Sequence, residues 1–237
     1  MAEILEAYVT NLGKYNEGRL ASETLVFPTT PEAVQDLLKH IGVDGIRYEE
    51  IFIAGYESSI PGLSQCLGEY ESLDELNYLA AMLSDLSKSD LETFAAVLDA
   101  GEYNGSVRDL INLVENLDCF DLYLGVTDDE TLGRIYVEDM EMLDVPENLK
   151  PYFDYEAYGR DVRINEDGHF APTGYLMKSG SEFVELYTGR DDIPAEHKVF
   201  SYPRLGIREQ MAAYQEVADK AAAQSERPAP MVGREDL

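Results

Sequence analysis

The side chains of this chain that could carry chemistry are mostly carboxylates, and they are dense in residues 125–144, GVTDDETLGRIYVEDMEMLD. Pairs of carboxylates can act as general acid and general base in glycoside hydrolysis, and sets of carboxylates can bind cations. Acid pairs are so frequent in this chain that any two could be proposed as a catalytic pair. The segment contains a single base, Arg134. It therefore indicates an acidic surface without pointing to a particular reaction.

Other reactive residues are isolated. His40, His169 and His197 lack the spacing of a zinc site or of a catalytic triad. The sequence RINEDGHF resembles a calcium-binding loop, but Arg163 and Gly174 would take the first and twelfth positions, which require acidic ligands. The sequence contains neither a phosphate-binding loop nor a dinucleotide fingerprint. We therefore expect a protein that is not an enzyme, with no catalytic residue, no metal and no cofactor.

A helix is expected to position the acids of residues 125–144. Thr127 followed by Glu130 matches a capping box, and acids in a first turn suit the helix dipole. The apolar residues recur at helical spacing within one arc of about 140°. They are Leu132, Ile135, Tyr136, Met140 and Leu143, whereas Glu130, Glu138, Glu141 and Asp144 fall on the other side and Asp139 lies inside the apolar arc. The helix would thus pack one face and expose its carboxylates.

The chain is strongly acidic, with 47 Asp and Glu against 18 Lys and Arg residues and a formal net charge of −29. Such a surface repels nucleic acids and anionic membranes and attracts basic partners. The sequence shows no signal peptide, no apolar stretch of membrane-spanning length, and only two cysteines, Cys66 and Cys119. We therefore expect a cytoplasmic protein with reduced, buried thiols that binds neither nucleic acid nor membrane.

The negative charge is spread over most of the chain. Residues 1–187 contain 38 acidic and 11 basic residues, a net charge of −27, whereas residues 188–237 contain nine and seven, a net charge of −2. An acidic tail of the kind typical of disordered arms is absent. Self-repulsion at this charge density disfavours a compact ball, so we expect an elongated molecule.

The expected fold class is α+β, in an elongated chain of three small domains (α+β N-terminal, helical middle, α+β C-terminal) plus a C-terminal helical extension. The expected boundaries are 1–70 for the N-terminal α+β domain, 71–118 for the small helical bundle, 119–187 for the α+β domain with the acidic helix, and 188–237 for the extension with a helix and a flexible tail.

Local signals predict the elements of each domain. In the first domain we expect strands over 3–11, 21–29 and 48–58, a turn-rich link over 12–19, and a helix over 31–42 that starts at Thr30 and Pro31 and ends at Gly42. In the second we expect helices over 72–87, 89–102 and 106–118, the first with a capping box of Ser72 and Glu75. In the third, a short helix over 152–160 is expected to end at Gly159, and NEDG (165–168) to form a hairpin tip. The extension should hold a helix over 205–224 and a frayed tail over 225–237.

Four long segments occur together in an order and spacing typical of one protein family. They are NLGKYNEG (11–18), GSVRDLINLVENLDCF (105–120), LGRIYVEDMEMLDVPENL (132–149) and YFDYEAYGRD (152–161). Over about residues 1–187 the chain resembles the ArdA family of antirestriction proteins. Residues 188–237 lie outside the resemblance.

The resemblance implies an elongated, acidic protein of three small domains that forms a homodimer through its C-terminal domain and imitates bent B-form DNA. It implies that the protein occupies the DNA-binding cleft of type I restriction–modification enzymes and inhibits them stoichiometrically, which protects an entering plasmid, transposon or phage genome. The antirestriction motif of the family falls around residues 132–145. Two copies of residues 1–187 carry a charge of −54, which equals that of about 90 Å of duplex at about one charge per 1.7 Å.

On this hypothesis a distributed set of carboxylates imitates phosphates, and the acidic helix leaves its acids unpaired because their basic partners belong to the restriction enzyme. The expected set is Asp85, Asp90, Glu92, Asp99, Glu102, Asp109, Glu115, Asp128, Asp129, Glu130, Glu138, Glu141, Asp144 and Glu147. Dimerisation is expected to use apolar surface of the third domain, at Tyr136 and Met140.

Three other interpretations remain open. An acidic DNA mimic could be aimed at another basic DNA-binding protein, which composition alone does not distinguish. An enzyme with a carboxylate site would show a few strongly coupled acids in a cleft and would turn over a substrate. A plain acidic interaction module would show its acids scattered around the whole surface.

Overall fold

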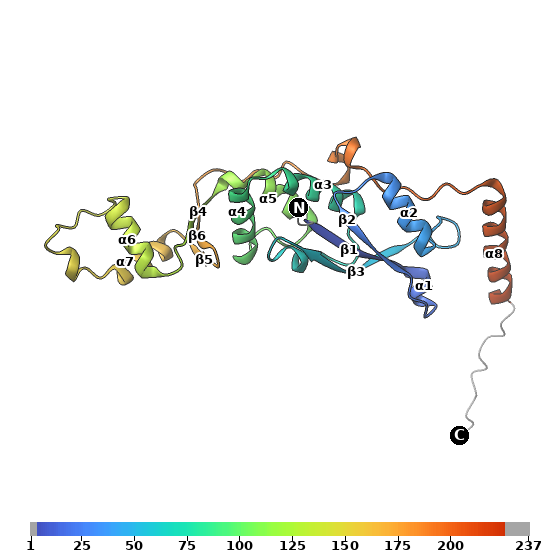
Figure 1. Ribbon diagram of the computed structural model, residues 1–237, viewed down its shortest axis with the longest axis horizontal. Helices are drawn as coiled ribbons and strands as arrows, with labels where there is room; N and C mark the ends of the chain where they lie inside the picture. Colours follow the sequence, from blue (N-terminus) through green and yellow to red (C-terminus); the bar gives the residue numbers. More distant parts are fainter. Residues whose placement is uncertain (1–3, 226–237) are drawn as a thin grey trace, which may run out of the picture.

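The computed structural model describes residues 4–225, and it shows an elongated molecule whose elements follow one another in a single row (Figure 1). Helices α1, α2 and α8 lie at one end of the row, and α6 and α7 at the other. The fold is mixed α and β with two small antiparallel sheets, in the strand orders β2-β1-β3 and β4-β6-β5. The expectation of an elongated α+β fold is confirmed, whereas its division into three domains stays a prediction.

Up to residue 118, the elements lie close to the segments that the local signals predicted. The strands are β1 (Leu5–Asn11), β2 (Ser22–Phe27), β3 (Ile51–Ser58), β4 (Phe120–Leu124), β5 (His169–Ala171) and β6 (Gly174–Lys178). The helices are α1 (Leu12–Asn16), α2 (Pro31–Ile41), α3 (Leu73–Asp85), α4 (Lys88–Asp99), α5 (Val107–Glu115), α6 (Asp129–Arg134), α7 (Tyr155–Asn165) and α8 (Ile207–Ser225). The link over 12–19, expected as a turn, contains the short helix α1.

Helix α2, between β2 and β3, shows why the local signals located the elements correctly in this part of the chain. The Thr30 hydroxyl accepts a hydrogen bond from the Ala33 amide at 3.3 Å, and Pro31 takes the first helical position. Gly42 ends the helix with a left-handed φ of 79°, which glycine adopts without strain. The predicted helix over 31–42 is therefore confirmed together with its start and stop signals.

Helices α3, α4 and α5 were also expected, but one of the expected caps is wrong. Ser87 and Ser106 cap α4 and α5 by accepting hydrogen bonds from backbone amides. Ser72 stands at the N-cap position of α3 and makes no side-chain capping bond. Glu75, its expected partner, instead accepts hydrogen bonds from Tyr187 and Arg190. A long-range contact has therefore replaced the local one.

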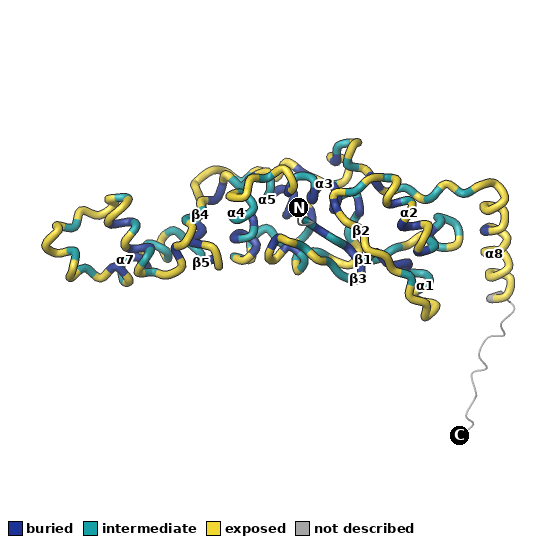
Figure 2. Tube along the Cα trace, in the orientation of Figure 1, coloured by how far each residue is buried: buried dark blue, intermediate teal, exposed yellow. Residues whose placement is uncertain are grey.

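One hydrophobic core runs through most of the row. It joins the first sheet, helices α3 to α5 and the strands β4 and β6, and it includes Tyr187, Ile193 and Val199 from the C-terminal region. A second, smaller core lies under α6, around Leu132 and Tyr136. Figure 2 shows these buried residues along the axis of the row, between exposed segments. The first sheet and the three middle helices are thus packed on a common core.

The acidic helix of residues 125–144 is shorter than predicted. Asp128, rather than Thr127, caps α6 by accepting a hydrogen bond from the Thr131 amide at 2.7 Å. The helix continues as a π-helical turn over Ile135–Asp139 and stops there, since Glu141 adopts a left-handed φ of 53°. Leu143, expected on the packed face, is exposed. Residues 141–149 are therefore a loop.

The expected stop at Gly159 is wrong because this glycine serves a helix–helix contact. Gly159 lies in the middle of α7 and faces Gly133 of α6. A Cβ atom added to Gly159 would lie 1.9 Å from the Asp129 carbonyl oxygen, and one added to Gly133 would lie 2.0 Å from the Tyr155 carbonyl oxygen. The two glycines therefore let the backbones of α6 and α7 approach closely.

The expected hairpin tip at NEDG is also wrong. Helix α7 extends to Asn165, and its end is followed by Asp167, whose φ of 53° is left-handed. The hairpin lies further along the chain, where residues 172–173 connect β5 to β6. A turn-rich sequence has here ended a helix.

After β6 the chain runs back along the row to the first sheet, and we call residues 179–206 the strap (Figure 1). Two buried asparagines, Asn112 in α5 and Asn116 directly after it, hold the strap. Each side-chain amide bonds to the backbone of one strap residue, as a neighbouring β-strand would. Asn112 donates to the Tyr187 carbonyl and accepts from the Tyr187 amide, both at 2.9 Å. Asn116 does the same for Val184, at 2.9 and 2.8 Å. The strap is thereby fixed to α5.

Further bonds fix the strap to α3 and to the first sheet. Asp74 accepts from the amides of Val199 and Phe200 at 2.6 and 2.7 Å. Asn77 donates to the His197 carbonyl at 3.1 Å and accepts from the Thr29 amide. The strap therefore ties the middle of the row to the first sheet before α8 begins. The helix of the extension is confirmed, and its expected frayed tail lies outside the described residues except at position 225.

Candidate partner-binding surface

The expected carboxylates of the middle helices fall into two groups. Asp85, Asp90, Asp109 and Glu115 make no ion pair within the described part of the chain, and Asp90 accepts a hydrogen bond from the Ser87 hydroxyl at 2.8 Å. Glu92, by contrast, lies 3.2 Å from Lys88, one helical turn before it. These acids belong to α3, α4 and α5, and most of their side chains reach solvent.

Two acids at the end of α4 contact the second sheet. Asp99 lies 2.9 Å from His169 of β5, and Glu102 lies 3.4 Å from Lys178 of β6. All four side chains are more than a third exposed, so solvent screens both pairs. Both pairs join the middle helices to the second sheet.

The acids of α6 are tied to their own surroundings. The Thr131 amide holds the pKa of Asp128 below its usual value, because its hydrogen bond favours the ionised carboxylate. Asp129 forms a half-buried pair with Arg163 of α7 at 2.8 Å. Glu130 pairs with Arg134 at 2.8 Å on the same helix. The single base of the segment thus serves the acids beside it.

Glu138 is held by a small cluster between α6 and α7. It accepts a hydrogen bond from the Tyr155 hydroxyl at 2.6 Å, which raises the pKa of that phenol. Arg134 lies 3.6 Å from Glu138, and its guanidinium carbon stands 4.4 Å from the centre of the Tyr155 ring. Glu138 therefore shares one arginine with Glu130.

The loop after the π turn exposes the remaining acids. Glu138, Glu141, Asp144 and Glu147 line an open hollow of about 360 Å³. Glu147 pairs with Lys150, whereas Glu141 and Asp144 are exposed and make no ion pair with any described residue. Four of its lining residues are acidic and one is basic, so the hollow is strongly acidic.

The expectation that the acidic helix leaves its acids unpaired is therefore wrong for Asp129, Glu130 and Glu138. The fourteen expected carboxylates divide into two equal groups. Seven have a basic partner within the chain: Glu92, Asp99, Glu102, Asp129, Glu130, Glu138 and Glu147. Seven have none among the described residues: Asp85, Asp90, Asp109, Glu115, Asp128, Glu141 and Asp144. Exposed ion pairs contribute only about 0–1 kcal/mol, so a competing base could replace the internal one at little cost.

A family model described as "Antirestriction protein (ArdA)" matches residues 7–177 of the chain. The chain belongs to the ArdA family. The match confirms the resemblance seen in the sequence and gives the protein an antirestriction function, which implies interaction with restriction enzymes. ArdA proteins are not known as enzymes. No curated protein gives a significant match to the chain.

The family region of this ArdA protein covers both sheets and helices α1 to α7, and it contains all fourteen expected carboxylates. The last residue of β6, the whole strap and α8 lie outside it. No helix in residues 4–225 is long and apolar enough to cross a membrane.

The two residues expected at the dimer contact belong to the small core under α6. Tyr136 is only 6% exposed, and its hydroxyl donates to the Glu166 carboxylate at 2.8 Å. Burial and this carboxylate raise the pKa of Tyr136. Met140 is half-buried against the same core. Dimerisation of the ArdA protein through these residues stays a prediction, and Tyr136 has little surface to offer.

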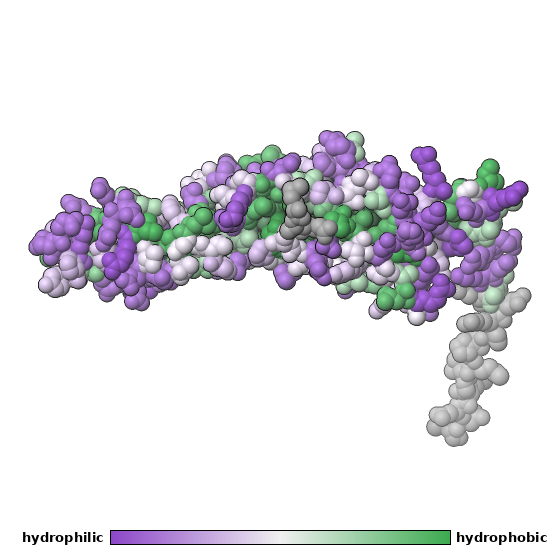
Figure 3. Space-filling model, viewed as in Figure 1, coloured by the Kyte–Doolittle hydropathy of each residue, from purple (hydrophilic) through white to green (hydrophobic). Residues whose placement is uncertain are grey.

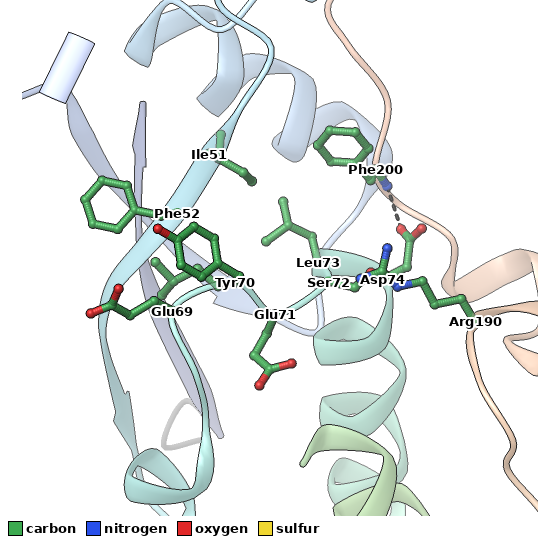
Figure 4. A pocket seen from close by; sticks show the side chains of 11 residues that line it. Ile51, Phe52, Glu69, Tyr70, Glu71, Ser72, Leu73, Asp74, Arg190 and Phe200 are labelled. Atoms are coloured by element: carbon green, nitrogen blue, oxygen red, sulfur yellow. Dashed lines mark hydrogen bonds between the residues drawn. The ribbon is translucent and has the colours of Figure 1, made fainter. Parts of the chain in front are cut away.

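Sequence reasoning missed a second hollow, of about 240 Å³, beside the edge strand β3 (Figure 4). The rings of Phe52 and Tyr70 and the carboxylates of Glu69 and Glu71 line it. Aromatic rings next to carboxylates suit a cationic side chain. The signal in the sequence was the run GEYES (68–72), in which tyrosine alternates with glutamate.

Proposed function

We propose that this ArdA protein is an acidic mimic of DNA. In this proposal it occupies the DNA-binding cleft of type I restriction–modification enzymes, inhibits them stoichiometrically, and protects incoming mobile DNA in the cytoplasm. The family supplies the antirestriction function. The mimicry rests on the charge and the shape of the chain, since residues 1–187 combine a net charge of −27 with an elongated fold.

The observation that carries the proposal is the set of seven carboxylates that have no basic partner among residues 4–225. They come from α3, α4, α5, the N-cap of α6 and the loop after the π turn, so they are spread along the row from its middle to the end formed by α6 and α7. Figure 3 shows hydrophilic surface along this length, with smaller hydrophobic areas between. Lysines and arginines that normally bind phosphates would bind these carboxylates instead. Long-range attraction would also speed the encounter.

A homodimer is part of the proposal because of scale. One copy of residues 1–187 matches the charge of about 45 Å of duplex, and two copies match about 90 Å, at about one charge per 1.7 Å. A long DNA-binding cleft is filled better by two copies, which match about 90 Å of duplex, than by one copy, which matches about 45 Å. No catalytic step is involved, so inhibition should follow the molar ratio of the two proteins.

The test mixes the purified protein with a type I restriction enzyme and a DNA fragment that carries its recognition site. We expect DNA cleavage to stop near a fixed molar ratio, and DNA and the protein to compete for the enzyme. Raising the salt concentration should weaken the inhibition steeply, as it weakens DNA binding.

Three results would contradict the proposal. Inhibition that is insensitive to salt would exclude an electrostatic mimic, and continued inhibition at trace amounts of the protein would indicate catalysis. Equal binding to an unrelated basic DNA-binding protein, with no effect on the type I enzyme, would favour a mimic with a different target.

A further inference from the structure

A hollow of about 550 Å³ lies at the end of the row where helices α1, α2 and α8 come together (Figure 1), and we call it the basic hollow. It is lined by side chains from α1, from the loops after α1 and α2, and from α8. Its charged lining consists of four bases and only two acids, namely Lys14, Arg19, Arg47 and Lys220 with Glu17 and Glu216. The whole chain, by contrast, has 18 bases against 47 acids. The basic hollow therefore reverses the charge balance of the molecule locally.

Lys220 of α8 links the bases of the hollow, because it shares both lining acids with an arginine. Its ammonium lies 3.6 Å from Glu17, which also pairs with Arg19 at 3.7 Å. It lies 3.6 Å from Glu216, one helical turn before it, which also pairs with Arg47 at 3.3 Å. Each of the two acids thus serves two bases. All of these side chains are at least a third exposed, so solvent screens the pairs and a stronger anion can replace them.

Lys14 is held at the same hollow without a carboxylate. Its ammonium donates a hydrogen bond to the Ile41 carbonyl at 2.7 Å, at the C-terminal end of α2, where the helix dipole favours a cation. It fills the space beside Gly42, where an added Cβ atom would lie 2.1 Å from it. The centre of the Tyr48 ring lies 5.8 Å from this ammonium and 5.4 Å from that of Lys220. Lys14 makes no ion pair with any residue of the described range, so its charge is available to a ligand.

The acids around the hollow do not balance its bases. Asp44 also pairs with Arg47, at 2.6 Å, but its carboxylate is held by the backbone amides of Ile46 and Arg47 and does not line the hollow. Even when Asp44 is counted, four bases face three acids. Burial lowers the pKa of Lys14, and the nearby charges of Arg19 and Arg47 lower it further. The bases therefore repel one another, and a bound anion would relieve this repulsion.

The chemistry of the bases indicates which anion fits. Guanidinium groups bind phosphate oxygens in a bidentate way, and ammonium groups add point charges beside them. A phosphate group carries about −1.5 to −2 charges at neutral pH, which suits a lining with two more bases than acids. A long polyanion would be repelled by a chain of net charge −29, whereas a small one can enter the hollow alone. We propose that the basic hollow binds a compact phosphate anion, such as pyrophosphate or the phosphates of a small phosphorylated molecule.

The proposal does not depend on DNA mimicry, and its test is calorimetric titration of the full chain with pyrophosphate at constant ionic strength. We expect saturable binding of one pyrophosphate per chain. Arg19→Gln/Lys220→Gln changes two exposed side chains and should weaken binding by about ten-fold or more, since one hydrogen bond between charged groups contributes this much. Lys88→Gln/Lys178→Gln is the matched control, because it removes the same charge outside the hollow, and its binding should equal that of the wild type. Absence of saturable binding, or equal weakening in both variants, would overturn the proposal.

Removing an acid of the hollow gives a second test with the opposite sign. Glu216→Gln frees Arg47 and Lys220 from their shared carboxylate and should tighten pyrophosphate binding by about two- to five-fold. Glu141→Gln makes the same change of charge at the other end of the row and should leave binding unchanged. Equal tightening in both variants would show that binding follows the overall charge and not the hollow. A single-stranded oligonucleotide should bind more weakly than pyrophosphate, and tighter binding would identify a nucleic-acid site and overturn the proposal.

Discussion

Replacing Asn112 with alanine should destabilise the protein by about 2–5 kcal/mol. Asn112 is 2% exposed, and its amide satisfies both the N–H and the C=O of Tyr187, which is 3% exposed. Each hydrogen bond contributes about 0.5–1.5 kcal/mol, and a buried polar group left without a partner costs about 1–3 kcal/mol. Two bonds are lost together here, and partial access of water to the strap would reduce the penalty toward the lower limit.

Urea unfolding measures this loss directly. Asn148→Ala is the matched control, because it removes the same amide from an exposed loop position and should change the unfolding free energy by less than about 0.5 kcal/mol. Hydrogen exchange adds a local measurement. The Tyr187 amide should exchange faster in Asn112→Ala, while the Val184 amide, which Asn116 holds, should change less. A loss as small as that of the control, or an unchanged Tyr187 amide, would refute the view that the asparagines hold the strap.

Three other predictions concern charge and packing. Single substitutions such as Asp85→Asn, Glu115→Gln or Asp144→Asn should change the inhibition of a type I enzyme by less than about three-fold, whereas combined neutralisation of all seven unpaired carboxylates should weaken it cumulatively. If one of these single changes abolished inhibition in a folded protein, the result would indicate a local binding site and contradict a distributed surface. Gly159→Ala should destabilise the protein by about 1–3 kcal/mol or more in thermal unfolding, because the added Cβ would meet the Asp129 carbonyl. Gly101→Ala is the comparison: its Cβ would meet no atom within 4 Å, so it measures only the cost of a left-handed φ. Asp128 has a lowered pKa in the folded state, so its stabilising effect is present above its unfolded pKa of about 3.9 and disappears as the pH falls through the folded value. Asp128→Asn should therefore flatten the acid limb of the stability profile between about pH 2 and 5, and an unchanged limb would show that other carboxylates determine it.

The parts of the fold that local sequence determines were predictable. Thr30, Pro31 and Gly42 act within one turn of the helix ends that they define, so the sequence alone located α2. Gly159 and NEDG carry the same kind of signal, and both were misinterpreted. The close approach of α6 to α7 explains the glycine, and the extension of α7 to Asn165 explains the turn-rich run.

The sequence predicted which residues make the candidate surface acidic, but it did not predict which of these acids pair with a base. The sequence indicates that residues 125–144 are acidic and present charge to solvent. It does not show that Arg163, 34 positions after Asp129, would pair with that acid, or that His169 would lie beside Asp99. The strap was missed for a related reason. Its backbone bonds to side chains of other elements, so it shows neither helical nor alternating periodicity in sequence.

The strap also has a thermodynamic consequence for any association of this molecule. A disordered acidic segment loses conformational freedom when it binds, and this loss is subtracted from its affinity. Here, hydrogen bonds at Val184, Tyr187, His197 and Val199 have already ordered the strap along the middle of the row. The carboxylates of the middle helices are therefore preorganised, and a partner meets them at spacings that folding has already set.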